Sequence, residues 1–154
     1  MIIKAFFSDF DGVFTDNNVF IDEKGKESVR CNRSDGIGIE NLKRNNIFFC
    51  IVSSEVIPLA SFRADKLGIS CFTSVKNKYQ LITSIQKKMN FSKSESAFLG
   101  NDINDLEAFD AVGLKMAVKD SYQDVLDVAD LILEKKGGMG AVREACDYIL
   151  KKQF

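Results

Sequence analysis

The fold is decided at the beginning of the chain, where the apolar run Ile2–Ser8 (IIKAFFS) leads directly into Asp9-Phe10-Asp11-Gly12 (DFDG). A short apolar run that ends in a glycine-containing turn is typical of a strand buried on both faces of a sheet. Five later runs have the same character: Ile47–Ser53, Ile69–Thr73, Ala97–Gly100, Leu114–Val118 and Asp130–Leu133. The sequence therefore predicts six buried strands.

Amphipathic helices are expected between these strands. Two apolar stripes with helical spacing are formed by Leu81, Ile82, Ile85 and Met89, and by Val142, Ala145, Cys146, Ile149 and Leu150. A third helix is expected from Pro58 to about Leu67, and Ser34-Asp35 is expected to cap a fourth. Alternating strands and helices predict an α/β fold, a Rossmann-like doubly wound parallel sheet covered on both faces. We expect the whole chain, 1–154, to form one domain.

One region, about residues 17–32, interrupts this alternation. Asn18–Ile21 and Glu27–Cys31 flank the charged, glycine-containing turn Asp22–Lys26, which predicts a β-hairpin inserted after the first strand. The two hairpin strands are apolar on one face only. An isolated hairpin is marginally stable in water, so this one is expected to pack on something, such as copies of itself.

The composition excludes several kinds of chemistry. The chain contains no His, which rules out imidazole bases, Ser-His-Asp or Cys-His catalysis and His-ligated zinc. A formal net charge of −1 gives no electrostatic reason to expect nucleic acid or a membrane as partner. The four cysteines form no Cys-x-x-Cys motif. Cys50, Cys71 and Cys146 lie in or beside apolar stretches and are expected to be reduced core residues. We expect a cytoplasmic protein, because no apolar run approaches the ~20 residues of a membrane span and the N-terminus is not that of a signal peptide.

Polar side chains follow four of the predicted strands, at the sheet edge where ligands bind in a doubly wound fold. They are Asp9 and Asp11 after the first strand, Ser53, Ser54 and Glu55 after the second, Lys76 and Lys78 after the third, and Asn101, Asp102 and Asp105 after the fourth. Two acidic clusters, a hydroxyl pair and a lysine are therefore expected to converge.

This mixture of groups suits phosphoryl transfer. Asp9 and Asp11 are two residues apart on an extended segment and point the same way, and such closely spaced carboxylates favour Mg²⁺. Gly12 permits a sharp turn and is expected to leave backbone N–H groups free for phosphate oxygens. Serine hydroxyls and a lysine can hold the transferred group, and an aspartate can act as its nucleophile.

Other motifs fit less well. An Asp-x-Asp pair is common by itself, and its spacing here is not that of an EF-hand loop. Gly36-Ile37-Gly38 lacks the third glycine of a dinucleotide fingerprint, and the chain has no P-loop. A phosphoacceptor receiver domain shares the fold type and Mg²⁺, but its phosphorylated Asp normally ends the third strand and not the first.

The same residues resemble the haloacid dehalogenase superfamily of phosphatases along the whole chain, from Ile3 to about Leu150. Its four motifs are similar to Asp9–Val13, Ser53, Lys78 and Gly100–Asp105. Within the superfamily, Asn32–Ile39 and Gly137–Glu144 resemble a group without a cap domain. That group contains the 3-deoxy-D-manno-octulosonate (KDO) 8-phosphate phosphatases, the nonulosonate 9-phosphate phosphatases, and phosphatase-like modules fused or paired with acylneuraminate cytidylyltransferases.

The resemblance implies a role for each motif. Asp9 would attack phosphorus and, with the backbone carbonyl of Asp11, bind Mg²⁺. Asp11 would protonate the leaving alcohol and then activate water, while Ser53 and Lys78 hold the phosphoryl oxygens. Members of this group are homotetramers whose hairpins form a central barrel. The glycine-rich C-terminal turn and its Arg143 are implied to close a neighbour's site, since no cap domain fits in the chain.

The implied substrate is a phosphorylated 2-keto-3-deoxy sugar acid. Glu55, with Lys66 eleven positions later, resembles a pair in the nonulosonate 9-phosphate phosphatases, which makes a nonulosonate 9-phosphate the first expectation and KDO 8-phosphate the second. A solvated Glu–Lys pair on one helix is the alternative for these two residues.

Asn101 departs from the family pattern, because the residue after Gly100 is normally an aspartate that binds the metal. Asn can coordinate through its amide oxygen but removes one negative charge, which weakens Mg²⁺ binding unless Asp102 compensates. Modules associated with cytidylyltransferases have the same variant. The rival expectation is therefore a catalytically weak oligomerisation module that partners an acylneuraminate or KDO cytidylyltransferase.

Overall fold

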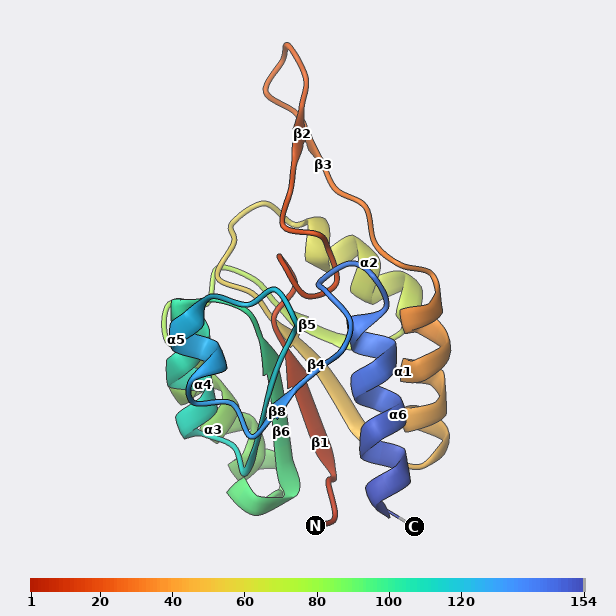
Figure 1. Ribbon diagram of the computed structural model, residues 1–154, viewed down its shortest axis with the longest axis vertical. Coiled ribbons are helices and arrows are strands. Elements are labelled where there is room, and N and C mark those ends of the chain that lie inside the picture. The colour runs from red at the N-terminus through yellow and green to blue at the C-terminus, as the bar shows by residue number, and fades with distance from the viewer. Residues whose placement is uncertain (154) are drawn as a thin grey trace.

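The computed structural model describes residues 1–153 and contains a six-stranded sheet in the order β5-β4-β1-β6-β7-β8, with all neighbouring strands parallel (Figure 1). The strands are β1 (Ala5–Ser8), β4 (Phe48–Val52), β5 (Ser70–Phe72), β6 (Ser96–Gly100), β7 (Leu114–Ala117) and β8 (Leu131–Ile132). All six predicted strands are confirmed. Most are shorter than the apolar run that predicted them, because burial extends beyond the residues that pair.

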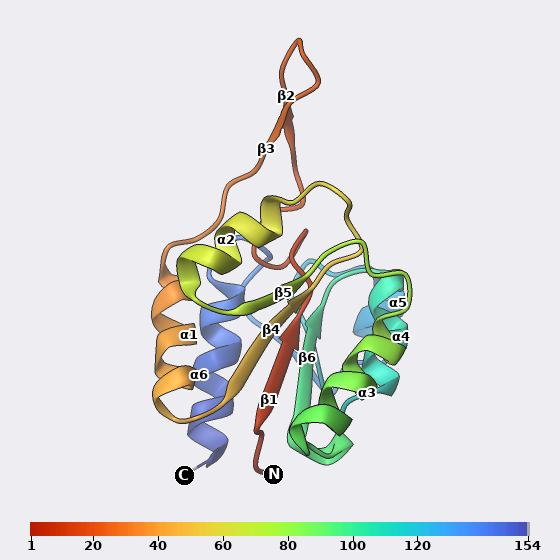
Figure 2. The same ribbon diagram turned by 180° about the vertical axis from the view of Figure 1, so that it is seen from behind.

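The helices form a layer on each face of this sheet, as Figures 1 and 2 show from opposite sides. They are α1 (Ser34–Arg44), α2 (Leu59–Leu67), α3 (Lys78–Met89), α4 (Leu106–Asp110), α5 (Gln123–Leu126) and α6 (Ala141–Gln153), with 3₁₀ turns η1 (Lys93–Glu95) and η2 (Ile103–Asp105). One apolar cluster joins the sheet to α1, α2 and α6, and a second joins it to α3, α4 and α5. The predicted doubly wound architecture is therefore confirmed.

The central strand β1 shows why its sequence is apolar without interruption. Phe6 packs in the first cluster, while Ala5 and Phe7 pack in the second, and all three are fully buried. Successive side chains of a strand point to opposite faces, so a strand covered on both faces needs apolar residues at every position.

The beginning of α1 differs from the prediction. Ser34 and Asp35 lie inside the helix, and the N-cap position is Arg33, which makes no side-chain cap hydrogen bond. The side chain of Asn32, one residue earlier, accepts hydrogen bonds from the N–H (2.9 Å) and hydroxyl (2.6 Å) of Ser34. Asp35 is fully buried and instead accepts a hydrogen bond from the backbone N–H of Arg143 (3.0 Å), in the first turn of α6. Burial raises the pKa of Asp35 to about 6, although this hydrogen bond opposes the shift. The predicted capping residue therefore caps a different helix.

Helix α3 also differs slightly from its predicted stripe. Met89 is 41% exposed, whereas Gln86 is buried and donates hydrogen bonds to Ser96 Oγ (3.0 Å) and to the carbonyl oxygen of Ala111 (2.9 Å). The polar Gln86 is tolerated in the second cluster because both partners satisfy its amide.

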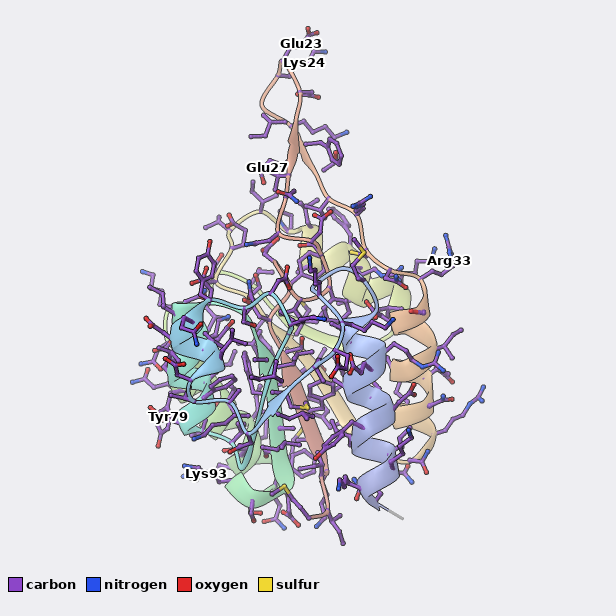
Figure 3. The ribbon with its side chains drawn as sticks, viewed as in Figure 1. Glu23, Lys24, Glu27, Arg33, Tyr79 and Lys93 are labelled. Atoms are coloured by element: carbon purple, nitrogen blue, oxygen red, sulfur yellow. The ribbon has the colours of Figure 1, made fainter. Side chains whose placement is uncertain are left out.

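The hairpin is present but shorter than predicted. Its strands β2 (Phe20–Ile21) and β3 (Glu27–Ser28) pair antiparallel and project away from the sheet and its helices (Figure 1). Glu23 and Lys24 lie at the tip, as labelled in Figure 3. Phe20 and Ile21 are about two-thirds exposed (66% and 64%), so in a single protomer they lie in water, whereas Val29 and Cys31 at the base of the hairpin pack on the first apolar cluster.

Two expectations from composition can be compared with residues 1–153. None of their helices is long and apolar enough to cross a membrane. All four cysteines are free, with Cys50 and Cys146 fully buried, and burial raises the pKa of the Cys50 thiol to about 12. These two thiols are inert core groups, as predicted, whereas Cys71 is only partly buried because it lies on the edge strand β5.

Candidate active site

The site lies where three neighbouring strands end. Asp9, Ser53 and Asn101 directly follow β1, β4 and β6, which are adjacent in the sheet order. These residues line a cavity of about 170 Å³ together with Asp11, Asn17, Ser54, Glu55, Asp102 and Asn104. The structure thus brings together most of the predicted site residues at the carboxyl edge of the sheet.

A buried ion-pair triad adjoins this cavity, and of its three members only Asp9 is among the lining residues. Lys78, the first residue of α3, is fully buried, and its Nζ lies 2.7 Å from Asp105 Oδ1 and 3.2 Å from Asp9 Oδ1. Burial lowers the pKa of Lys78, but the two carboxylates outweigh it and the net shift is upward. Lys78 is therefore a charged ammonium that holds the Asp9 carboxylate.

The pKa of Asp9 reflects the same triad. Burial raises it to about 8 and the charge of Asp105 adds to this, whereas Lys78 and the hydrogen bond from the Phe10 N–H (2.8 Å) lower it. Both of these stabilising contacts use Oδ1, so Oδ2 is the oxygen that they leave for a reaction partner. A bound cation would favour the ionised carboxylate further.

Asp105 belongs to the predicted acidic cluster, but no role was predicted for it. Its Oδ2 accepts hydrogen bonds from the backbone N–H groups of Asn101 (2.9 Å) and Asp102 (3.3 Å), while its Oδ1 binds Lys78. Gly100 permits this approach, since a Cβ there would lie 2.7 Å from the Asp105 side chain. One buried carboxylate therefore fixes both the lysine and the turn that carries Asn101. The sequence signals for it were its position at the end of an acidic cluster and at the end of the fourth motif, Gly100–Asp105.

Asn101 is buried with its amide oriented by its neighbours. Its Nδ2 lies against Gly12, where any Cβ would overlap with it, and its Oδ1 is buried without a hydrogen-bond partner. A buried carbonyl oxygen without a partner is costly, which indicates that a ligand satisfies it.

Gly12 is required by its conformation and by this contact. Its φ is +80°, a left-handed value that favours glycine. Its N–H donates to Thr15 Oγ1 (3.0 Å), so the expected free N–H for phosphate is not found at this position. The loop closes back on itself here, which the sequence did not reveal.

Asp11 lies half-buried at the mouth of the cavity. Burial raises the pKa of its carboxyl, and the charges of Glu55 and Glu27 raise it further, while Lys78 opposes them. A carboxyl that keeps its proton more readily than usual is suited to act as a general acid.

Ser53, Ser54 and Glu55 form the opposite wall. Ser53 is buried and its Oγ accepts a hydrogen bond from the Glu55 N–H (3.2 Å). Glu55 also lines a second cavity of about 190 Å³ that shares Asp11 and Ser53 with the first and extends to Glu27 of the hairpin. The site is therefore continuous with the base of the hairpin.

Lys66 and Arg143 do not line these cavities. Lys66 is exposed near the end of α2, in a groove of about 400 Å³ that it shares with Arg33 and Arg63. Arg143 Nε forms an ion pair with Asp147 (2.9 Å) on α6. Glu55 precedes α2, so Glu55 and Lys66 are not a pair on one helix. Within one protomer, Lys66 and Arg143 are therefore separate from Asp9, whereas Glu55 lines the same cavity as Asp9.

The cavity fits a hard cation. Asp9 and Asp11 supply carboxylate and carbonyl oxygens, Asn101 supplies its unpartnered amide oxygen, and Asp102 lines the same cavity. In residues 1–153, no three His, Cys, Asp or Glu side chains are grouped so that they could hold a metal ion. Oxygen donors of this kind suit Mg²⁺.

Comparison with known proteins shows what this arrangement is similar to. The family model of haloacid dehalogenase-like hydrolases matches residues 69–145. The chain is 31% identical over 152 residues to the 3-deoxy-D-manno-octulosonate 8-phosphate phosphatase KdsC of Salmonella typhi, covering 98% of this chain and 81% of that protein.

Solved structures agree with this similarity. The corresponding phosphatase of Moraxella catarrhalis, in complex with magnesium, phosphate and KDO, superposes with a TM-score of 0.93 at 32% identity, covering 98% of this chain and 87% of that one. The cobalt-bound phosphatase of Haemophilus influenzae superposes with a TM-score of 0.92 at 33% identity, covering 98% and 89%.

Proposed function

The chain belongs to the haloacid dehalogenase-like hydrolases and is a metal-dependent phosphatase of a sugar phosphate, and we propose that its substrate is a phosphorylated 2-keto-3-deoxy sugar acid. The observation that carries the proposal is the Lys78–Asp9–Asp105 triad beside a cavity that also holds Asp11 and Ser53. This arrangement supplies a nucleophile, a second carboxyl and a cation at one point.

In the proposed reaction, Asp9 attacks the phosphorus of the ester and displaces the sugar oxygen, which takes a proton from the Asp11 carboxyl. Asp11, now ionised, accepts a proton from a water molecule that attacks the aspartyl-phosphate, and inorganic phosphate and the Asp9 carboxylate are released. Lys78 and the Ser53 hydroxyl hold the phosphoryl oxygens and offset their charge. The raised pKa of Asp11 supports its first role, as an acid.

Mg²⁺ is the proposed metal, held by Asp9, the Asp11 carbonyl and the amide oxygen of Asn101, with Asp102 beside them. Such an ion would offset the negative charge that builds up on the phosphoryl oxygens. The unpartnered Oδ1 of Asn101 supports this ligand set.

Two substrates remain to be distinguished. The relatives and solved structures named above support KDO 8-phosphate. The resemblance of Glu55 to a residue of the nonulosonate 9-phosphate phosphatases supports that substrate, and Glu55 lines both cavities beside Asp11, where its carboxylate can accept hydrogen bonds from sugar hydroxyls.

The test is release of inorganic phosphate in the presence of Mg²⁺ from KDO 8-phosphate, a nonulosonate 9-phosphate and an aryl phosphate. We expect kcat/KM for one sugar acid to exceed that for the aryl phosphate by about 10²-fold or more, since only the sugar can use binding energy from the rest of the site. Equal rates for all three would contradict the proposed substrate class. No release above the Asp9→Asn variant would contradict the phosphatase mechanism.

A homotetramer is the second part of the proposal. Val19, Phe20 and Ile21 expose apolar surface on the hairpin, and Lys66 and Arg143 lie outside the protomer's own site, where a neighbour's site could use them. Light scattering is expected to give the mass of four chains. Phe20→Lys is expected to give a smaller species, whereas Glu23→Gln at the tip, which changes the net charge by the same one unit, is the matched charge control. A monomeric wild-type protein would contradict this part.

The alternative function, a weakly catalytic module that partners a cytidylyltransferase, is favoured by Asn101. Asn101→Asp restores a charge at this position. We expect it to tighten Mg²⁺ binding at least about tenfold, since a unit charge beside the ion contributes more than ~1.4 kcal/mol in a partly buried site. Calorimetric titration measures this affinity, and Asn104→Asp, in the same cavity, controls for long-range charge.

The two functions give different results when the turnover of the wild type and of Asn101→Asp is measured together with their Mg²⁺ affinity. An active wild-type enzyme that changes little in Asn101→Asp supports the phosphatase. A wild-type protein without turnover that gains it in Asn101→Asp supports the module. Equal Mg²⁺ affinity in Asn101→Asp, Asn104→Asp and the wild type would show that Asn101 is not a ligand.

A further inference from the structure

A glycine-rich turn, Gly137–Gly140, packs directly against the loop that follows the catalytic aspartates. A Cβ on Gly137 would overlap with the carbonyl oxygen of Gly12 and lie 2.9 Å from that of Thr15. The N–H of Gly138 donates to the carbonyl oxygen of Val13 (3.0 Å). The turn therefore supports the Gly12 peptide of its own protomer at van der Waals distance, and only glycine fits.

The other side of Gly12 faces Asn101. A Cβ on Gly12 would overlap with Asn101 Nδ2 and lie 2.8 Å from its Cγ. The Gly12 backbone is thus enclosed between Gly137 and the Asn101 amide. Because Nδ2 is held against Gly12, the position of Gly12 determines where the buried Oδ1 of Asn101 lies.

A third segment, the loop after β7, connects both sides of this sandwich. Asp120 Oδ1 accepts a hydrogen bond from the Gly137 N–H (2.9 Å). Two residues later, the N–H of Tyr122 donates to the carbonyl oxygen of Asn101 (2.9 Å). The contacts form a closed ring from Gly137 through Gly12 and Asn101 to the loop after β7 and back. A ring of packed and hydrogen-bonded backbone resists displacement of any one member.

We propose that Gly137 is a positioning residue that holds the Gly12 peptide, and through it Asp11 and the Asn101 amide oxygen, in the geometry that phosphoryl transfer requires. The inference rests on the proposed function and extends it to a residue that lines neither of the two cavities of the site. A methyl group at position 137 must displace the Gly12 carbonyl. A misplacement of about 1 Å at a reacting group can reduce the rate about 10²-fold.

The test compares Gly137→Ala with Gly140→Ala, in the same turn. Gly140 has a φ of +91°, so alanine is strained there, but its nearest neighbour is Ser34 Oγ at 3.5 Å and the Gly12 loop is not touched. We expect Gly137→Ala to lower kcat about 10²-fold with KM within about threefold, and to weaken Mg²⁺ binding measured by calorimetry. Gly140→Ala is expected to lower the melting temperature and to keep kcat within about threefold.

Asp120 provides a second pair of variants in case Gly137→Ala does not fold. Asp120→Ala removes the acceptor for the Gly137 N–H and is expected to lower kcat about tenfold. Asp120→Asn keeps an acceptor oxygen and is expected to keep kcat near that of the wild type. Equal loss of kcat in Gly137→Ala and Gly140→Ala, or in the alanine and asparagine variants of Asp120, would overturn the inference. If the wild type releases no phosphate, the proposed function fails, and the Mg²⁺ affinities of the same variants still decide whether Gly137 positions Asn101.

Discussion

Replacing Asp9 with asparagine is expected to lower kcat on the order of 10³-fold or more, which is the size of loss found when a nucleophile is removed. An amide cannot form the aspartyl-phosphate, and it does not carry the negative charge that Lys78 and the metal hold in place. Phosphate release with the preferred sugar acid measures the effect. Asp110→Asn, which changes an exposed carboxylate at the end of α4, is the matched control and is expected to leave kcat unchanged.

The same substitution has an opposite effect on stability. Because the pKa of Asp9 rises from 3.8 to about 8 on folding, the folded protein binds more protons than the unfolded chain between these values. Stability therefore falls as the pH rises from about 4 to about 8. The Asp9→Asn variant has no titrating group at this position, so its stability does not fall in this way between about pH 4 and about pH 8. Without Mg²⁺, its melting temperature is therefore expected to exceed that of the wild type at pH 8 and to match it near pH 4. Retained turnover in a folded Asp9→Asn protein would exclude Asp9 as the nucleophile.

Replacing Lys78 with methionine is expected to destabilise the fold by about 3–5 kcal/mol, the range found when one partner of a buried ion pair is removed. Asp105 is fully buried and Asp9 nearly so, and both carboxylates would lose their cation. The total free energy of unfolding of a protein is about 5–15 kcal/mol, so the variant is expected to lose a large fraction of it. Urea denaturation at low temperature, where the variant is still folded, measures the loss. Turnover is expected to be lost as well, because Lys78 is the residue proposed to hold a phosphoryl oxygen.

Two further variants separate the structural role of Lys78 from its catalytic role. Lys76→Met changes an exposed lysine two residues earlier and is expected to affect neither stability nor turnover. Lys78→Met combined with Asp105→Asn removes one of the uncompensated charges, so it is expected to regain part of the stability without regaining turnover. A Lys78→Met protein as stable as the wild type would contradict the buried triad.

Much of the candidate site was predictable because it depends on the ends of strands. The uninterrupted apolar runs placed β1, β4 and β6 in the sheet, and parallel strands present their carboxyl ends at one edge. Asp9, Ser53 and Asn101 were therefore expected at one edge of the sheet, and the strand order β4-β1-β6 in the structure brings them together. Lys78 was predicted to join them, and the structure places its ammonium between Asp9 and Asp105.

Other features could not be predicted, because they join residues that are far apart in the chain. Asp35 resembles a capping residue for its own helix, yet it accepts a hydrogen bond from Arg143, 108 positions later. Gly12 resembles a phosphate-binding turn, yet its N–H is used by Thr15. Local patterns of polarity describe burial and periodicity, but they do not state which partner a buried polar group finds.

The sequence by itself thus determined the succession of strands and helices along the chain, the inserted hairpin and the family, since periodicity and motif spacing are local properties of the chain. Only the tertiary structure decided that Asp105 fixes both Lys78 and the Asn101 turn. Only the tertiary structure showed that Gly137 supports Gly12 and that Lys66 lies outside the protomer's site. These contacts depend on how the layers pack and on distances of a few ångströms, which no pattern along the chain specifies.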